Sequence, residues 1–588
     1  MKLKIFLGVA ACALVASSCS DEMNYREDTG GKYDEAYVKQ AFENVRGLVT
    51  NIYGQLDYEQ GQNYGGAFLG SASDESVFSK TSSVETFFNG NWSPSNPQNT
   101  EWTSCYAAIS DANYYLADFS EGLNFPEHEL DDSYKQEMNM YVKYFPYEVR
   151  FLRAYYYFKL VRQYGDIPFY TGKLSKDSVN SLERTPAKEI FKFIDDECAD
   201  IVNHLPMQWA QATEAITTDQ LRATKLAVLA LRARAALYAA SPLFNKDGSN
   251  EQELWRQAAL KSKAVIDSCL SQNFALEANY ENTWGDGSQV TGPTHEIIFS
   301  RPTWMDSKPE QRNFPVGITG AGAGGNCPTQ TLVEAYDLKD GTEVDWSDPA
   351  KAVAQFDNFD PRFSKTIARN GEKKWPFYNT KALETFYNGV SGEPAIGATP
   401  TSYYLKKLLD HSGVIDLRPN KNTKIRHPWT IFRLGEFYLD YAEAVFRWLG
   451  SANLLPSGEG FESGYAKSAR EAVNETRARA GVAALPAGLD NDTFWHKYER
   501  ERMVELAFEG HRFWDVRRWK EGYKFSGKNI YVMKITKNDD GTFSYNRQNL
   551  ADERIDWDDK MYLFPIDATE MLKHQKFGTK WEQNPGWN

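Results

Sequence analysis

Helical periodicity recurs along most of this chain and limits the folds that it can adopt. The first eight periodic segments form four successive pairs, and stacked helix pairs are typical of tetratricopeptide-type repeats. Alanines at Ala230, Ala233 and Ala236 in the third pair mark where two helices must approach closely. Generic helix packing remains the alternative within this mainly α-helical fold. Apolar residues spaced three and four apart predict helices over 33–56, 102–119, 144–164, 186–204, 224–240, 252–270, 429–448, 463–480 and 493–509.

Two long segments, residues 57–101 and 276–425, interrupt the helical pattern. Both are rich in glycine, proline and aromatic residues. Loops of this length inside a compact protein are usually functional or disordered, and the aromatic content argues against disorder. We therefore expect one domain over 32–588 in which a helical scaffold carries two binding insertions. Its expected parts are N-terminal helices over 32–275 with the insertion 57–101, a ligand-binding insertion over 276–425, a C-terminal repeat and helix over 426–520, and a tail over 521–588.

The first nineteen residues predict export. Lys2 and Lys4 precede an apolar run over 5–16, and small residues then lead to Cys19. About twelve apolar residues are too few for a membrane-spanning helix, which needs about 20. The position of Cys19 resembles a bacterial lipobox, which implies removal of 1–18, a lipid on Cys19 and a polar tether over 19–31. The alternative is an ordinary secretory signal with an incidental cysteine.

Composition excludes several classes of function. The formal net charge of −14 argues against nucleic acid as a partner, because phosphate binding depends on Lys and Arg. The chain has no CxxC, HxxxH or HExxH pattern, so we expect neither a metal nor a cofactor. Buried free thiols are favoured over disulfides for the four remaining cysteines, whose pairing the sequence leaves open: Cys105, Cys198, Cys269 and Cys327.

Catalytic signatures are weak. Gly320, Gly322 and Gly325 match the dinucleotide-binding pattern, but no βαβ context surrounds them. We therefore expect a loop that leads into a helix. Neighbouring carboxylates such as Asp74 and Glu75 could suit glycoside hydrolysis, but 80 acidic residues make such neighbours unavoidable.

The segment 499–519 mixes arginines, carboxylates and aromatic residues at helical spacing. Its charges suggest structural ion pairs rather than a site for a polyanion. We expect Arg512, Arg517 and Arg518 to pair within this segment, with the carboxylates Glu505, Glu509 and Asp515.

A set of motifs gives the chain a family resemblance that covers nearly all of the mature sequence. It resembles SusD/RagB-type outer-membrane lipoproteins of Bacteroidetes. The resemblance implies a non-catalytic, glycan-binding subunit on the extracellular face, beside a SusC-like TonB-dependent transporter. It also implies an α-helical fold with four tetratricopeptide-type repeats. The motifs are FLRAYYYFKLVRQYGDIPF (151–169), ATKLAVLALRARAALYAASPLFN (223–245), PTQTLVEAYDLKDG (328–341), FRLGEFYLDYAEA (432–444), RARAG (477–481), ERMVELAFEGHRFWDVRRW (501–519), YLFPID (562–567) and QNPGW (583–587).

The ligand expected from this resemblance is an uncharged oligosaccharide held by the two insertions. Aromatic rings stack on the apolar faces of sugars, and polar groups bind the hydroxyls. Some members of the family serve peptide uptake, so a peptide ligand is the alternative within the family, and a glycoside hydrolase is the alternative outside it. Core packing is the alternative role for each aromatic residue. The candidate binding residues are Asp74, Trp92, Asn96, Trp284, Trp304 and Tyr387.

Overall fold

The computed structural model describes residues 35–56, 61, 63–98, 100–123, 125, 132–209, 222–284, 296–302, 305–317, 322–373, 382–410, 412–421 and 423–588. Cys19, the export signal, the tether and Trp304 therefore lie outside the described residues. In the part of the chain that is described, no helix has the length and apolar character needed to cross a membrane.

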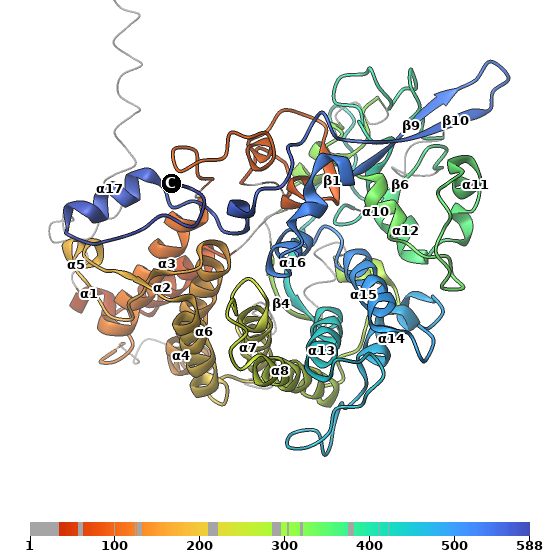
Figure 1. Cartoon of the computed structure of the whole chain (residues 1–588). Helices are drawn as coiled ribbons and strands as arrows, with labels where there is room; N and C mark the ends of the chain where they lie inside the picture. The colour runs from red at the N-terminus through yellow and green to blue at the C-terminus, as the bar shows by residue number, and fades with distance from the viewer. Residues whose placement is uncertain are drawn as a thin grey trace, which may run out of the picture.

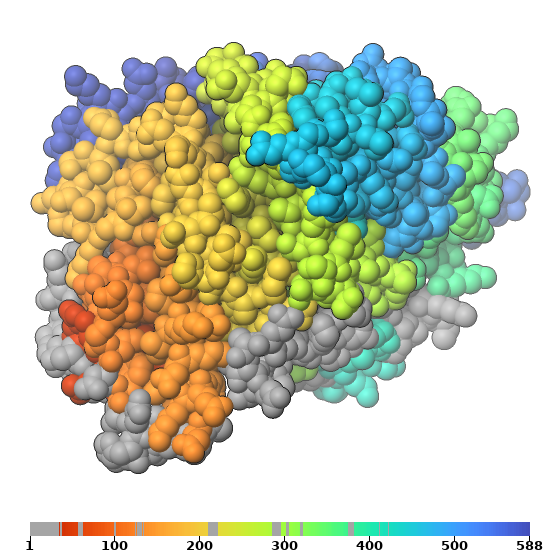
Figure 2. Space-filling model, turned by 90° about the horizontal axis from the view of Figure 1, so that it is seen from below, coloured from red at the N-terminus to blue at the C-terminus, as the bar shows by residue number. Residues whose placement is uncertain are grey.

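The longer helices form one continuous series in which each packs on the next. In Figure 1 the series runs around the lower side of the molecule, and Figure 2 shows it from below. The expected pairs α2–α3, α4–α6, α7–α8 and α13–α14 all pack together. Their assignment as tetratricopeptide repeats stays a prediction. The helices are α2 (Phe42–Gly54), α3 (Thr100–Asp118), α4 (Asp132–Tyr164), α6 (Ala187–Ile201), α7 (Lys225–Ala240), α8 (Glu251–Ser271), α13 (Leu434–Leu449), α14 (Ala469–Ala480) and α15 (Asn491–Glu505).

Local chemistry explains where several of these helices begin. The Thr224 side chain accepts a hydrogen bond from the Ala227 amide and caps α7. Ser468 and Glu471 form a capping box on α14, which therefore starts later than the predicted 463. The predicted start of α13 at Trp429 is wrong, because residues 428–433 form a strand.

The described residues form five small antiparallel sheets of two strands each, and two of these sheets, β1–β5 and β4–β8, join distant parts of the chain. The β1–β5 sheet joins the two insertions, with Val77 opposite Cys327. Residues 276–425 also contain short helices, so this insertion is only partly irregular. The sheets are β1 (Ser76–Phe78) with β5 (Asn326–Pro328), β2 (Ile167–Pro168) with β3 (Arg184–Thr185), β4 (Ile297–Pro302) with β8 (Pro428–Arg433), β6 (Ile367–Ala368) with β7 (Tyr404–Leu405), and β9 (Tyr531–Lys537) with β10 (Phe543–Asn549).

The remaining helices are short. Those of the second insertion are α9 (Lys308–Asn313), α10 (Gln330–Glu334), α11 (Pro349–Val353) and α12 (Pro361–Thr366). As expected, Gly324 and Gly325 lie in a loop that leads through β5 into α10. Elsewhere lie α1 (Glu35–Lys39), α5 (Lys176–Asn180), α16 (Arg512–Arg518) and α17 (Ala568–Lys576).

A buried network of ion pairs joins the helices to the second insertion. Glu505, in α15, accepts hydrogen bonds from Arg362 at 2.7 Å, from Arg433 at 2.7 Å, and from Arg479. Burial alone would raise the pKa of the Glu505 carboxyl, but the three arginines hold it well below its usual value. Glu505 is therefore a permanently charged structural anchor.

The arginines of α16 confirm the expected structural ion pairs only in part. Arg518 pairs with Glu443 at 2.5 Å and with Asp515 at 2.9 Å. Arg512 also forms an ion pair, although its partner Asp74 lies in the first insertion. The expectation is wrong for Arg517, which has no ion pair within the described residues and stacks on Phe513, 3.5 Å from the ring centre.

The four described cysteines are free and buried, as favoured from the sequence. They are Cys105, Cys198, Cys269 and Cys327. No group of His, Cys, Asp or Glu side chains suited to a metal ion occurs among the described residues.

Candidate ligand-binding surface

The two insertions meet beside β1 and β5. The Ser79 amide continues the strand pairing by donating to the Gly325 carbonyl at 2.9 Å. Asn326 is fully buried, and its side-chain oxygen accepts from the Phe68 amide at 2.8 Å while its amide nitrogen donates to Asn313 at 2.9 Å. Because these bonds satisfy a buried polar side chain from both insertions, they fix the two loops relative to each other.

A third loop, residues 384–400, lies against this junction. Gly324 adopts a φ of +84°, and a Cβ there would lie 1.9 Å from the Gly397 carbonyl oxygen. The Ser391 hydroxyl donates to the Val316 carbonyl at 2.7 Å. Only glycine allows so close an approach of two backbones with this φ.

The β9–β10 hairpin completes the surface. The Tyr387 amide donates to the Ile535 carbonyl at 2.8 Å, and the Phe386 and Phe543 rings lie 5.3 Å apart. Lys534 forms an ion pair with Glu393 at 2.7 Å. In Figure 1, β1, β9 and β10 lie on the upper side, away from the helical series.

These segments together present what we call the loop platform. Its side chains combine apolar and polar groups on one set of loops. Tyr387 is 55% exposed, Val390 is 53% exposed and Ile396 is 98% exposed. The Lys80 side chain reaches Gly397, because a Cβ on that glycine would lie 3.4 Å from the lysine Cε. The platform consists of Lys80, Tyr387, Val390, Glu393, Ile396 and Lys534.

Of the candidate residues named from the sequence, only Tyr387 lies on the loop platform. Asn96 is exposed and hydrogen-bonded to the Asn91 carbonyl at 3.2 Å. The neighbouring Pro94 carbonyl accepts from Ala568 of α17, so Asn96 lies on a different part of the surface. Trp304 lies outside the described residues.

Three other candidates are buried, which argues for a packing role rather than ligand contact. Trp92 is 4% exposed and packs edge-on against Phe564 and Trp587, with ring centres 4.7 and 5.1 Å apart. Trp284 is 3% exposed and lies edge-on against Tyr280 at 5.1 Å. An indole with both faces covered offers no surface for a sugar ring.

Asp74 is the third buried candidate. Its two carboxylate oxygens accept from the Arg512 guanidinium at 2.9 and 2.7 Å. Burial disfavours the charge on Arg512, but Asp74 raises the pKa of the guanidinium above its usual value. The adjacent Glu75 is also buried, and burial raises its pKa to about 8. These oxygens face the protein interior instead of a ligand.

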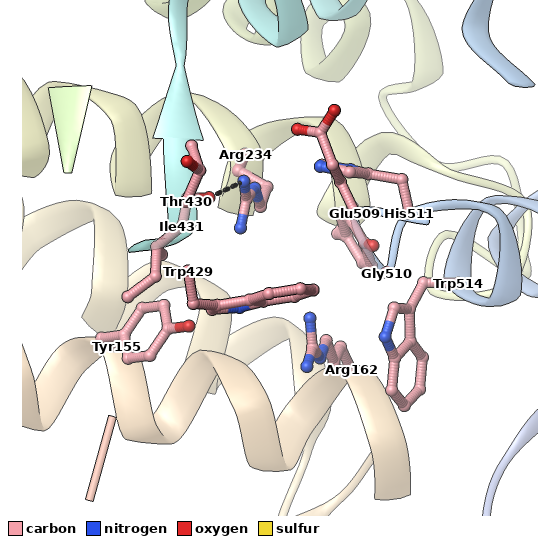
Figure 3. A pocket seen from close by; sticks show the side chains of 11 residues that line it. Tyr155, Arg162, Arg234, Trp429, Thr430, Ile431, Glu509, Gly510, His511 and Trp514 are labelled. Atoms are coloured by element: carbon pink, nitrogen blue, oxygen red, sulfur yellow. Dashed lines mark hydrogen bonds between the residues drawn. The ribbon is translucent and has the colours of Figure 1, made fainter. Parts of the chain in front are cut away.

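A small polar pocket lies deeper in the molecule, between α4, α7, β8 and α16. Figure 3 shows the Trp429 indole lying across it, with Arg162 and Trp514 on one side and Arg234 on the other. Arg234 donates to the Ile431 carbonyl at 2.6 Å. The pocket has a volume of about 30 Å³, which suits a water molecule or two and is too small for a sugar ring.

Two larger hollows lie on the helical side, with volumes of about 500 and 490 Å³. They share Lys188, Phe244 and Lys246; the first lies between the start of α6 and residues 580–585, and the second lies between α6, α7 and the start of α8. None of the residues proposed from the sequence lines either hollow.

Comparison with known proteins identifies the family. The model of the SusD family matches residues 279–587, more than half of the chain. The chain belongs to the SusD family. A second family model, described as starch-binding and associating with the outer membrane, matches residues 32–237.

Individual relatives of this SusD-family chain are distant in sequence but similar in fold. SusD-like protein P2 of Formosa agariphila is 22% identical over 497 residues, covering 83% of this chain and 80% of that protein. The crystal structure of a SusD-like protein from Bacteroides fragilis aligns with a TM-score of 0.73 at 22% identity, covering 94% of this chain and 98% of that chain. A laminarin-binding SusD-like protein aligns with a TM-score of 0.59 at 19% identity, covering 93% of this chain and 99% of that chain. The α-helical SusD-like fold expected from the sequence is confirmed.

Sequence reasoning missed most of the platform. Val390 and Ile396 were not proposed, because apolar side chains are ordinarily assigned to the core. Their setting among glycines and a proline, in YNGVSGEPAIG (387–397), was the available signal for an exposed loop.

Proposed function

We propose that this SusD-family chain is a non-catalytic, surface-exposed lipoprotein that captures an oligosaccharide or polysaccharide on the loop platform. The observation that carries the proposal is the exposed Tyr387 on the loop 384–400, which lies against the junction of both insertions. The starch-binding description of one matching family and the laminarin-binding solved neighbour support a glycan as the ligand.

The platform has the chemistry that a sugar requires. An exposed tyrosine ring can stack on the apolar face of a pyranose, with Val390 and Ile396 extending the apolar area. Glu393 and Lys534 form a partly exposed ion pair. The carboxylate of Glu393 can accept further hydrogen bonds from sugar hydroxyls, and the ammonium group of Lys534 can donate further ones. Each hydrogen bond to a charged group contributes about 1.5–3 kcal/mol, so a few such contacts give moderate affinity.

The same proposal includes delivery of the ligand. A lipid on Cys19 would hold the domain on the outer face of the outer membrane, beside a SusC-like TonB-dependent transporter. Tethering raises the effective concentration of the bound glycan at the transporter without new contacts. No cofactor takes part.

The positions of the two carboxyl groups that could suit hydrolysis, Asp74 and Glu75, support binding without catalysis. Glycoside hydrolysis requires an acid whose proton is available to the substrate. Asp74 is bound to Arg512, and one carboxyl oxygen of Glu75 accepts a hydrogen bond from the Phe508 amide. Both carboxyl groups are buried, so neither presents a proton at the surface.

The test is a binding panel of neutral glycans, including laminarin and starch, against the wild-type protein and three variants. Tyr387→Ala should weaken binding roughly 2- to 10-fold, since an aromatic contact contributes about 0.5–1.5 kcal/mol beyond area burial. Tyr387→Phe keeps the ring and should bind nearly as the wild type. Tyr523→Ala is the matched control, because Tyr523 is 57% exposed on a turn that packs on α16.

Three results would overturn the proposal. Binding of peptides without any glycan would favour the alternative within the family. Release of shorter sugars from the panel would show catalysis. Equal glycan affinity for Tyr387→Ala and Tyr523→Ala would remove the platform as the site.

A further inference from the structure

The outward side of α17 is unusual for its exposed apolar groups. His574 points inward and stacks on the Trp581 ring, with ring centres 3.7 Å apart. The Trp581 indole nitrogen donates to the Leu182 carbonyl at 2.9 Å, which fixes α17 beside α5. Leu572, two residues before His574, lies on another side of the helix and is 59% exposed, and Phe577, which follows the last turn, is 41% exposed.

Lysines surround these apolar side chains. Residues 568–588 carry three lysines and two glutamates, in a chain whose formal net charge is −14. One of the glutamates, Glu570, pairs with Lys573 at 2.7 Å. Within the described residues, neither Lys576 nor Lys580 has an ion pair, and both are exposed.

The segment before α5 continues this surface toward the beginning of the described chain. Leu174 is 41% exposed, and Lys176 opens α5. The neighbouring Lys173 pairs with Asp118 at the end of α3 at 2.6 Å, and this pair raises the pKa of the lysine. Figure 1 shows α1, α5 and α17 on the same side of the molecule. We call this surface the basal patch, and it consists of Leu174, Lys176, Leu572, Lys576, Phe577 and Lys580.

We propose that the basal patch lies on the headgroups of the outer membrane and orients the domain on it. The proposal rests on the lipid anchor at Cys19 included in the proposed function. Sixteen peptide units separate Cys19 from Glu35 and can span at most about 55 Å. The first described helix, and with it the patch, is therefore confined near the bilayer.

A lipid surface fits the chemistry of the patch. Apolar side chains beside lysines are typical of helices that lie in the membrane interface, where the apolar groups enter the boundary region and the lysines meet anionic headgroups. Each lysine near an anionic membrane contributes a few-fold in binding. A patch of this kind would hold one side of the domain on the bilayer and leave the loop platform free.

The experiment uses the lipidated protein in phosphatidylcholine vesicles, with or without phosphatidylglycerol, that carry a brominated-lipid quencher. A Leu572→Cys variant is labelled with an environment-sensitive fluorophore, which the four buried native thiols do not take up. Leu455→Cys is the matched control, because Leu455 is 60% exposed on the loop after α13, outside the basal patch. We expect quenching at residue 572 in anionic vesicles and little at residue 455.

Charge reversal tests the role of the lysines. Lys576→Glu with Lys580→Glu should reduce the quenching at residue 572 by roughly an order of magnitude, while the protein still floats with the vesicles. Equal quenching at residues 572 and 455 in floating protein, or quenching unchanged by charge reversal, would overturn the patch and leave the proposed function standing. Failure to float would overturn the anchor at Cys19 and the patch with it.

Discussion

Replacing Asp74 with alanine should destabilise the protein strongly and leave ligand affinity unchanged. The Asp74 side chain is 3% exposed and the Arg512 side chain is 8% exposed, and they share two hydrogen bonds of 2.9 and 2.7 Å. Asp74→Ala leaves the Arg512 charge buried without its partner. Breaking a buried pair in this way costs about 3–5 kcal/mol. That loss is a large share of a typical unfolding free energy of about 5–15 kcal/mol.

The assay is urea unfolding followed by tryptophan fluorescence, with glycan affinity measured on the folded variant at low temperature. Asp556→Ala is the matched control, since Asp556 forms an exposed pair with Lys528 at 2.9 Å. Loss of such an exposed pair costs about 0–1 kcal/mol. The double variant Asp74→Ala with Arg512→Ala should recover part of the loss, because no buried charge is left unpaired.

Two outcomes would refute this reasoning. If Asp74→Ala shifts the urea midpoint no more than Asp556→Ala does, the buried pair contributes nothing to stability. If Asp74→Ala keeps its midpoint but loses glycan binding, Asp74 contacts the ligand as the sequence first suggested.

Three further predictions concern one buried carboxyl, one glycine and the four described cysteines. The pKa of Glu75 is about 8 when folded against about 4.5 when unfolded, so stability is lost as pH rises through this window; Glu75→Gln should therefore gain up to roughly 5 kcal/mol over wild type at about pH 9 and little at about pH 4 in urea unfolding. Gly324→Ala should lower glycan affinity and the melting temperature more than Gly488→Ala, which shares a positive φ but whose Cβ would meet nothing within 4 Å; equal effects would show that backbone strain alone matters. A thiol reagent should label none of the four described cysteines in the native protein and all four in denaturant, and rapid native labelling would contradict their burial.

The helices could be predicted because their signal is local. A 3.6-residue period needs only the neighbouring sequence, so α7 and α8 were placed within a residue or two. The predicted start of α13 was wrong because the segment PWTIFR (428–433) is equally typical of a buried strand. Only pairing with β4, which is distant in sequence, makes it a strand. Short apolar runs of this kind are ambiguous without tertiary contacts.

The candidate binding residues were harder to predict because their burial depends on distant partners. Trp92 and Tyr387 both lie in glycine-rich insertions, and nothing local distinguishes them. Trp92 is covered by Phe564 and Trp587 near the C-terminus, whereas Tyr387 is 55% exposed. The role of Asp74 likewise depends on a distant partner, because it pairs with Arg512, 438 positions away.

The contacts between the first insertion and the last part of the chain have a consequence for how the protein is made. Arg554 donates to the carbonyls of Ser71, Ser73 and Ser76, which are 478 to 483 positions earlier in the chain. A polypeptide that emerges N-terminus first therefore cannot complete the core around residues 71–76 until nearly all of it has been synthesised. Such distant pairings slow folding and leave apolar surface exposed in the meantime. A chain truncated before residue 550 should be a substrate for chaperones and proteases, even though every helix pair of the scaffold is present.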